Sequence, residues 1–214
     1  MKKSHIILIV SVILIVSAGF SILLYRRKSK KSIVRIARAE LLKWQGLTEL
    51  SQNMSQILIK YWKSVGLHFS EYQMQSSSVQ NTYPWSSAFI SYLFYKSGAK
   101  EKFPYSSAHA GYFQVAKRNR DNKNAPLRGF RINEYAPKLG DLVVYSRQSG
   151  AGYDTKGFFA SHGELVVEIG KGFIKTIGGN VSDSVKESKF TTDSKGYLKG
   201  NRVSFFMVIQ NNIR

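Results

Sequence analysis

The stretch His162 to Asn180, HGELVVEIGKGFIKTIGGN, contains two apolar runs separated by Gly170-Lys171-Gly172. Runs rich in valine and isoleucine and bounded by glycines are typical of β-strands, and a short glycine-containing turn between them is typical of a hairpin. The runs LGDLVVYS (139–146) and NRVSFFMVIQ (201–210) have the same character. We therefore expect four strands that form an antiparallel sheet.

The chain before these strands has the period of helices. In SIVRIARAELLKW (32–44) the apolar residues share one helical face,. Further helices are expected within LSQNMSQILIKYWKSVG (50–66), PWSSAFISYLF (84–94) and PYSSAHAGYFQVAKRN (104–119), and a polar loop within QSSSVQNT (75–82). Helices followed by an antiparallel sheet predict an α+β domain.

An apolar segment precedes this domain. Residues 6–24, IILIVSVILIVSAGFSILL, carry no charge, and about 20 such residues cross a bilayer as a helix. A secretory signal peptide is the alternative, because Val16-Ser17-Ala18 resembles a cleavage site,. The apolar run extends beyond what a signal peptide needs, so we favour an uncleaved, single-pass membrane anchor. The expected division is an anchor with its basic flank at 1–31 and a globular domain at 32–214.

Two arguments about the side of the membrane conflict. The basic run RRKSKK (26–31) follows the apolar segment, and the positive-inside rule would place it, and the domain after it, in the cytoplasm. The chemistry considered below suits the periplasmic or extracytoplasmic side, which we favour. The sequence leaves both orientations open.

The protein is strongly basic, with a formal net charge of +19. Residues 1–43 hold ten of the 32 basic residues and one of the 13 acidic ones, so the rest of the chain keeps 22 basic and 12 acidic residues, a net charge of +10. This charge can be a membrane flank plus a solvated surface, or it can attract anionic lipids or cell-wall polymers. No nucleic-acid-binding motif accompanies it, so no nucleic-acid partner is expected.

Several kinds of site are excluded or not expected. The chain has no cysteine, which excludes disulfides, thiolate metal sites and a thiol nucleophile. Its four histidines are far apart in sequence and no glycine-rich phosphate loop is present, so neither a metal nor a cofactor is expected.

Ser86 is the candidate nucleophile. It lies in the first turn of the helix predicted from Pro84, where the helix dipole favours developing negative charge and the free N–H groups can hold an oxyanion. A serine at this position is also common simply as a local hydrogen-bonding residue at a helix start. Spacing alone does not distinguish the two roles.

A serine nucleophile requires a base and a group that orients the base. His162 begins a strand between Ser161 and Gly163, and Asn180 follows the next strand, which a hairpin would place beside His162. An asparagine in that position could hold the imidazole in the required tautomer, as in the Cys-His-Asn triad. His109 lies in the first turn of another predicted helix. Each of these residues could instead be an ordinary hydrogen-bonded core or turn residue.

Five motifs together resemble a bacterial family catalogued as domain of unknown function 2272. They are PWSSAFISYLF, FPYSSAHAGYF, GDLVVY, SHGELVVEIG and TIGGNVSDSV, and the resemblance covers roughly residues 33–210. That family is similar to the papain-like superfamily of CHAP-domain amidases and NlpC-type cell-wall peptidases. The resemblance therefore implies a papain-like domain, with its N-terminal helices packed on the antiparallel sheet.

The resemblance also implies roles for individual residues. The superfamily has a Trp-Cys pair at a helix start, a histidine at the first strand and a polar residue on the next, which correspond here to Trp85-Ser86, His162 and Asn180. Serine replaces the superfamily's cysteine, and a hydroxyl depends more on its base than a thiol does. Residues expected to contact substrate are Trp85, Ser87 and His109.

The expected function is a membrane-anchored hydrolase that cleaves amide bonds, in peptidoglycan or another anionic cell-envelope polymer. Ser86 would be the nucleophile, His162 the base and Asn180 the residue that orients it. The alternatives are a catalytically inactive cell-wall-binding module on the same fold, and an acyltransferase or lipid hydrolase.

Overall fold

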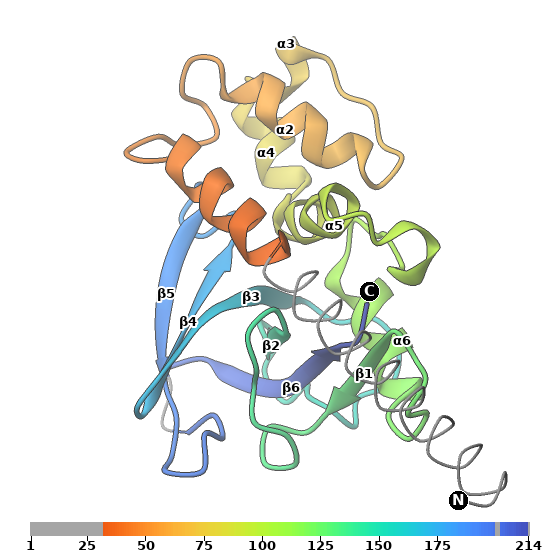
Figure 1. Ribbon diagram of the computed structural model, residues 1–214. Coiled ribbons are helices and arrows are strands. Elements are labelled where there is room, and N and C mark those ends of the chain that lie inside the picture. Colours follow the sequence, from red (N-terminus) through yellow and green to blue (C-terminus); the bar gives the residue numbers. More distant parts are fainter. Residues whose placement is uncertain (1–31, 200–201, 214) are drawn as a thin grey trace, which may run out of the picture.

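The computed structural model describes residues 32–199 and 202–213, and it has the α+β architecture predicted from the sequence. A helix over residues 32–43 is followed by further helical elements and then by the strands (Figure 1). The helical elements are α2 (Met54–Lys63), α3 (Glu71–Met74), α4 (Ser77–Thr82), α5 (Ser86–Lys96), the 3-10 turn η1 (Lys100–Lys102) and α6 (His109–Arg118). The strands are β1 (Leu127–Phe130), β2 (Leu142–Ser146), β3 (Ser161–Gly170), β4 (Phe173–Gly178), β5 (Lys186–Thr191) and β6 (Ser204–Asn211).

The strands form one six-stranded antiparallel sheet in the order β1-β6-β2-β3-β4-β5. The four strands expected from the sequence are confirmed as β2, β3, β4 and β6. The hairpin prediction is also confirmed, since Gly170 pairs with Phe173 and Leu165 with Ile177. β3 lies between β2 and β4 and is buried from His162 to Val167, so its first residues lie inside the molecule.

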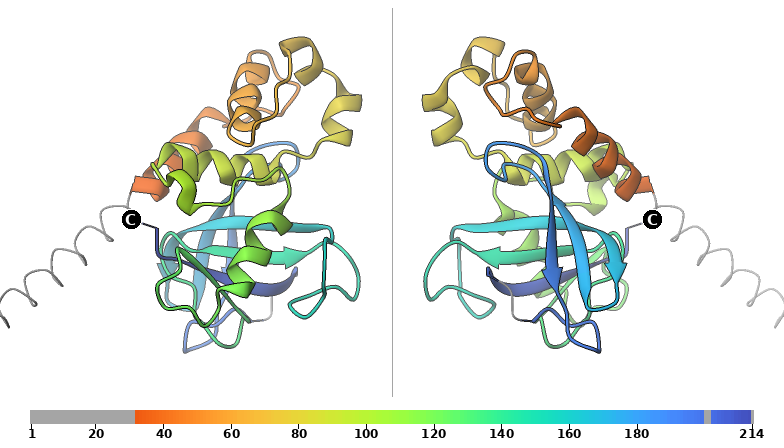
Figure 2. Two further views of the ribbon diagram at one scale, coloured as in Figure 1. Left: turned by 90° about the vertical axis from the view of Figure 1, so that its right-hand side faces the viewer. Right: turned by 90° about the vertical axis from the view of Figure 1, so that its left-hand side faces the viewer.

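Helix α5 is the centre of the helical layer. All its residues from Ser86 to Phe94 are buried, as expected for a helix that is surrounded by protein on every side. It contacts α2 on one side and β3 and β4 on the other. The two side views show the helices over residues 32–96 gathered on one side of the sheet (Figure 2). The N-terminus of α5 is thereby held against the central strands.

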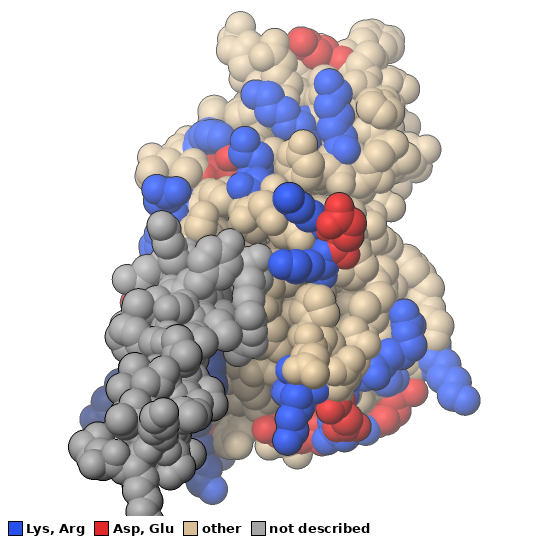
Figure 3. Space-filling model, turned by 45° about the vertical axis from the view of Figure 1, so that its right-hand side comes forward, with Lys and Arg blue, Asp and Glu red and all other residues tan. Residues whose placement is uncertain are grey.

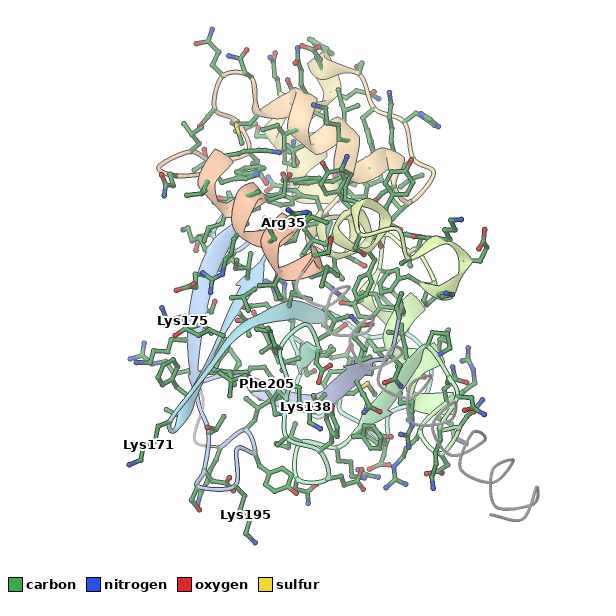
Figure 4. All side chains as sticks on the ribbon, in the orientation of Figure 1. Arg35, Lys138, Lys171, Lys175, Lys195 and Phe205 are labelled. Atoms are coloured by element: carbon green, nitrogen blue, oxygen red, sulfur yellow. The ribbon has the colours of Figure 1, made fainter. Side chains whose placement is uncertain are left out.

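The sheet has apolar residues on both faces. The face toward the helices contributes residues such as Leu142, Leu165 and Ile177 to the main core. The opposite face carries a smaller cluster formed by Val143, Val166 and residues around them. Phe205, labelled in Figure 4, packs against this second cluster. A functional site built on the helix-facing side is thus supported from behind by a second packed layer.

The edge strand β5 is polar and charged. Lys175 on β4 lies 3.2 Å from Glu187 on β5 and 3.5 Å from Glu168 on β3, so ion pairs cross three strands. Lys171 at the β3–β4 turn and Lys195 beyond β5 project away from the body (Figure 4). Charged side chains of this kind keep an edge strand from pairing with another chain.

The basic residues are dispersed on one face of the domain. On the face shown in Figure 3, lysine and arginine side chains are spread over several elements, and acidic side chains lie among them. This distribution resembles a solvated surface more than a continuous basic stripe on that face.

Two further expectations have different outcomes. The polar stretch 75–82 was predicted to be a loop, which is wrong: it contains α4, whose N-cap Ser76 accepts a hydrogen bond from Val79 N–H. The predicted anchor at 6–24 lies outside the described residues. Among the helices that the structure does describe, none has the length and apolar character that a membrane crossing requires.

Candidate active site

Ser86 and His109 meet at the starts of two helices. Ser86 is the first residue of α5 and His109 the first residue of α6, and a hydrogen bond of 2.7 Å joins Ser86 Oγ to His109 Nε2. Only 6% of Ser86 and 5% of His109 are exposed. A hydroxyl this close to a ring nitrogen is the arrangement in which a histidine can take the proton of a serine nucleophile.

Neighbouring serines of α5 hold α6 in place. The hydroxyls of Ser87 and Ser91 both donate to the carbonyl of Ser106, at 2.8 and 3.1 Å, and Ser106 N–H donates back to Ser91 Oγ. The segment that leads into His109 is thereby attached to the helix that carries Ser86. Ser87, expected to contact substrate, is 1% exposed and its hydroxyl is used in this attachment.

Tyr112 fixes the second nitrogen of His109. One helical turn along α6, its hydroxyl is hydrogen-bonded to His109 Nδ1. Burial raises the pKa of Tyr112 well above its usual value, so the phenol keeps its proton. A methyl group on Gly163 would overlap the Tyr112 hydroxyl and lie 3.0 Å from His109 Nδ1, so this close approach of α6 to β3 requires a glycine.

His162 lies directly behind His109. The two ring centroids are 5.3 Å apart. Arg147 Nη2 lies 3.2 Å from His162 Nδ1 and donates to it, because a guanidinium has only donors,. The neutral ring therefore carries its proton on Nε2, which makes no hydrogen bond and lies 3.6 Å from Glu164 Oε1.

Glu164 completes the buried polar cluster. Its carboxyl accepts hydrogen bonds from Tyr145, at 3.3 Å, and from Thr176. Burial raises the pKa of Glu164, and the hydrogen bonds that it accepts oppose that rise. The cluster thus runs from Ser86 through His109 and His162 to Glu164.

Both histidines are neutral in the folded protein at neutral pH. Burial, and secondarily the charge of Arg147, lowers the pKa of His109 to about 3. Burial, His109 and Arg147 together lower the pKa of His162 well below its usual value. His109 can therefore accept a proton, but it does so readily only when negative charge develops beside it.

A cavity of about 300 Å³ opens onto the Ser86–His109 pair. Its lining residues come from the starts of α5 and α6 and from the segment between β2 and β3: Pro84, Ser86, Ser107, Ala108, His109, Arg147, Phe158, Phe159, Ala160 and Ser161. A larger hollow of about 450 Å³ lies beside Trp44 and Val185, but no histidine lines it. We take the smaller cavity as the candidate site because the reactive side chains open onto it.

The histidine expected to pair with Ser86 was His162. The structure instead places His109 against Ser86, with His162, which is 0% exposed, one ring further in. Asn180 was expected to orient His162. If the register of the Leu165–Ile177 pair continued, Asn180 would lie across from His162. The strand β4 ends at Gly178, however, before the chain reaches Asn180. The hydrogen bond to the His162 ring comes from Arg147.

Trp85 was expected to contact substrate. It is completely buried, stacks on Trp44 at 4.9 Å and donates its indole N–H to Glu49 at 2.7 Å. In this structure it supports the start of α5 from within the core.

Tyr112 and Arg147 carried no role in the sequence analysis. Tyr112 could have been found from its i, i+3 spacing to His109 on one helix, which brings the two side chains together. Arg147 lies in the segment after β2, and no local pattern connects it to the helix starts. Within the described ranges, no group of three or more histidine and acidic side chains is placed to hold a metal ion.

The residues of the site all lie within the part of the chain that matches one protein-family model. No curated protein and no solved structure matches the chain significantly. One family model, described as "Uncharacterized protein conserved in bacteria (DUF2272)", matches residues 44–206. Because this match spans well over half of the sequence, the chain belongs to the DUF2272 family of bacterial proteins.

Proposed function

We propose that this protein is a serine-dependent hydrolase that cleaves amide bonds, with Ser86 as nucleophile and His109 as general base. The observation that supports this most directly is the 2.7 Å hydrogen bond between Ser86 Oγ and His109 Nε2 at a cavity. The proposal keeps the nucleophile expected from the sequence and replaces the expected base, His162, by His109.

The proposed reaction has two halves. Ser86 Oγ attacks the amide carbonyl while its proton passes to His109 Nε2, and the N–H groups in the first turn of α5 stabilise the oxyanion. His109 then gives the proton to the departing amine, leaving an acyl-serine. Water, deprotonated by His109, hydrolyses this ester and restores the Ser86 hydroxyl.

Tyr112 has a positioning role in this proposal. For Ser86 to donate to Nε2, the neutral His109 ring must carry its proton on Nδ1 and donate it to the Tyr112 oxygen. The negative charge that forms on the oxyanion stabilises the imidazolium, which compensates for the low pKa of His109 in the free site,.

Peptidoglycan is the proposed substrate class, on the basis of the resemblance described above. The apolar segment at 6–24 would hold the domain at the membrane. The proposal places the domain on the extracytoplasmic side, where peptidoglycan lies, against the orientation that the basic run at 26–31 favours,. The net charge of +10 on residues 44–214 favours association with an anionic envelope polymer.

Covalent labelling tests the nucleophile independently of the natural substrate. The full-length protein in detergent is incubated with a fluorophosphonate, and the modified peptide is identified by mass spectrometry. We expect modification at Ser86 and its loss in Ser86→Ala. Ser97→Ala, at the far end of α5, is the matched control and should label normally.

Digestion of purified peptidoglycan tests the reaction itself. New amino groups should appear with the wild-type protein and with Ser97→Ala, and not with Ser86→Ala. If wild-type protein neither labels at Ser86 nor releases amino groups, the hydrolase proposal fails.

A non-catalytic binding module is the second candidate. It is favoured by the low exposure of Ser86, 6%, and by the pKa of about 3 for His109, which makes a weak base. This candidate predicts saturable binding of peptidoglycan fragments without cleavage, and equal binding by wild-type protein and Ser86→Ala.

A further inference from the structure

Arg147 is the charged residue of the cavity. Among the described lining residues it is the one with a permanent charge, since burial keeps His109 neutral at neutral pH. Its backbone N–H donates to the carbonyl of Ala160 at 2.8 Å, which joins the two ends of the segment between β2 and β3. The guanidinium of Arg147 therefore extends from a segment whose two ends are hydrogen-bonded together, and it lines the same cavity as Ser86 and His109.

The charge of Arg147 is not neutralised by an ion pair with any described acidic side chain. Arg131 shows the alternative: it makes a two-pronged ion pair with Asp154, at 2.8 and 2.6 Å. Arg147 instead donates one N–H to the neutral ring of His162. This bond, together with one that the guanidinium donates to the Tyr145 hydroxyl, orients Arg147. A guanidinium has five N–H groups, so these two contacts leave others for a ligand.

The surroundings of Arg147 suit a small anionic group with an apolar part. Pro84 and Phe159 line the cavity, and Phe158, which is 73% exposed, lies at its entrance. No acidic residue is among the described lining residues. A planar guanidinium recognises a carboxylate through paired N–H donors, and Ser86 and His109 line the same cavity of about 300 Å³.

We propose that Arg147 binds a carboxylate of the substrate, so that the enzyme selects acyl compounds with a carboxylate a few atoms from the scissile carbonyl. This inference rests on the proposed function for the scissile bond, but the binding step stands separately. Arg147 is then the specificity-determining residue, and its contact with His162 holds it in position.

The test uses glutaric acid mono-4-nitroanilide, which carries a carboxylate three carbons from an amide carbonyl. Its neutral counterpart has a carboxamide in place of the carboxylate. Binding of both compounds to the full-length protein is measured by calorimetry in the Ser86→Ala background, in which no turnover occurs. We expect the carboxylate compound to bind about tenfold to a hundredfold more tightly, the range for a charge-assisted hydrogen-bonded pair.

Variants of two positive residues distinguish a local contact from general attraction. Arg147→Met should remove the preference for the carboxylate, and Arg147→Lys should restore part of it. Lys156→Met removes one positive charge from the same segment but not from the cavity lining, and it should keep the preference. Circular dichroism checks that each variant is folded.

The outcomes separate the two proposals. Equal affinity for both compounds, no binding of either, or a preference that survives in Arg147→Met overturns the role of Arg147. A preference that depends on Arg147, in a protein that releases no 4-nitroaniline, does not label at Ser86 and releases no amino groups from peptidoglycan, supports the carboxylate-binding site and contradicts the hydrolase proposal.

Discussion

The imidazole rings of His109 and His162 lie 5.3 Å apart, and both are enclosed in the protein interior. Each would be harder to protonate if the other were charged, and Arg147 acts on both in the same direction. The proposed base therefore operates in an environment that resists protonation.

The free energy of unfolding should fall as the pH is lowered from about 6.5 toward 3. The pKa of His109 is about 3 in the folded protein and near 6.5 when unfolded, so the unfolded state binds more protons within this window. Each such proton changes stability by up to about 1.4 kcal/mol per pH unit. His162 contributes with the same sign, because its pKa is also lowered.

Urea titrations at several pH values measure this slope. Glu164 acts in the opposite direction, since burial raises its pKa from 4.5 in the folded protein, so the contribution of His109 between pH 6.5 and 3 is obtained by comparing variants. His109→Gln should flatten the slope there, whereas His68→Gln, in a loop, should not. A slope unchanged by His109→Gln would contradict the assignment.

The pH profile of activity should not show the usual histidine titration. In the free enzyme His109 stays neutral down to about pH 3, so kcat/KM should not fall with an apparent pKa near 6.5. The profile of the proposed hydrolysis should instead stay level on the acid side until unfolding begins. An acid limb with a pKa between 6 and 7 would show that the base is another group or that His109 is more solvated.

Tyr112→Phe should lower kcat with little change in KM. The variant removes the partner of His109 Nδ1 without touching the Ser86 contact, so the imidazole loses its fixed tautomer. Nitrogen-15 NMR of the imidazole measures the tautomer directly and should show a mixture in the variant. Tyr105→Phe is a suitable control, because the Tyr105 hydroxyl is buried without a hydrogen bond. Unchanged kcat together with an unchanged tautomer would contradict the positioning role.

The sequence predicted the strands whose local pattern is apolar and missed those defined by tertiary contacts. β2, β3, β4 and β6 are rich in valine, isoleucine and phenylalanine. β5 has the sequence KESKFT and pairs only with β4 at the sheet edge. β1 has four residues, and Gly129 in it allows α6 to approach closely. Neither missed strand has a local signal.

The site was predicted in part for a similar reason. Ser86 follows from a helix start, which is a local property. The choice between His109 and His162 as the base depends on which imidazole ring contacts Ser86. Because the two ring centroids are only 5.3 Å apart, sequence spacing could not decide between them. Arg147 enters the site through the closure of the segment between β2 and β3, which is again a tertiary relationship.

Trp85→Phe should destabilise the protein by about 1–3 kcal/mol, the cost of leaving a buried polar group without its partner. The indole N–H of Trp85 donates to the carboxylate of Glu49 at 2.7 Å. Burial raises the pKa of Glu49 and this hydrogen bond lowers it. Urea unfolding should show a smaller loss for Trp85→Phe in a Glu49→Gln background. Equal losses in both backgrounds would mean that packing alone accounts for the effect.

Gly163→Ala should reduce activity through the Tyr112–His109 pair. An added methyl group would overlap the Tyr112 hydroxyl, and β3 cannot retreat because Gly163 is paired with Val144 in the central sheet. The tyrosine and the His109 ring must move instead, which lengthens the contact with Ser86. We expect slower fluorophosphonate labelling of Ser86 and a lower kcat. Gly152→Ala is the matched control, since its added methyl group would meet only Phe206, at 3.8 Å. If Gly163→Ala labels as fast as Gly152→Ala while both stay folded, the close approach of β3 does not position the base, and the proposed role of Tyr112 fails with it.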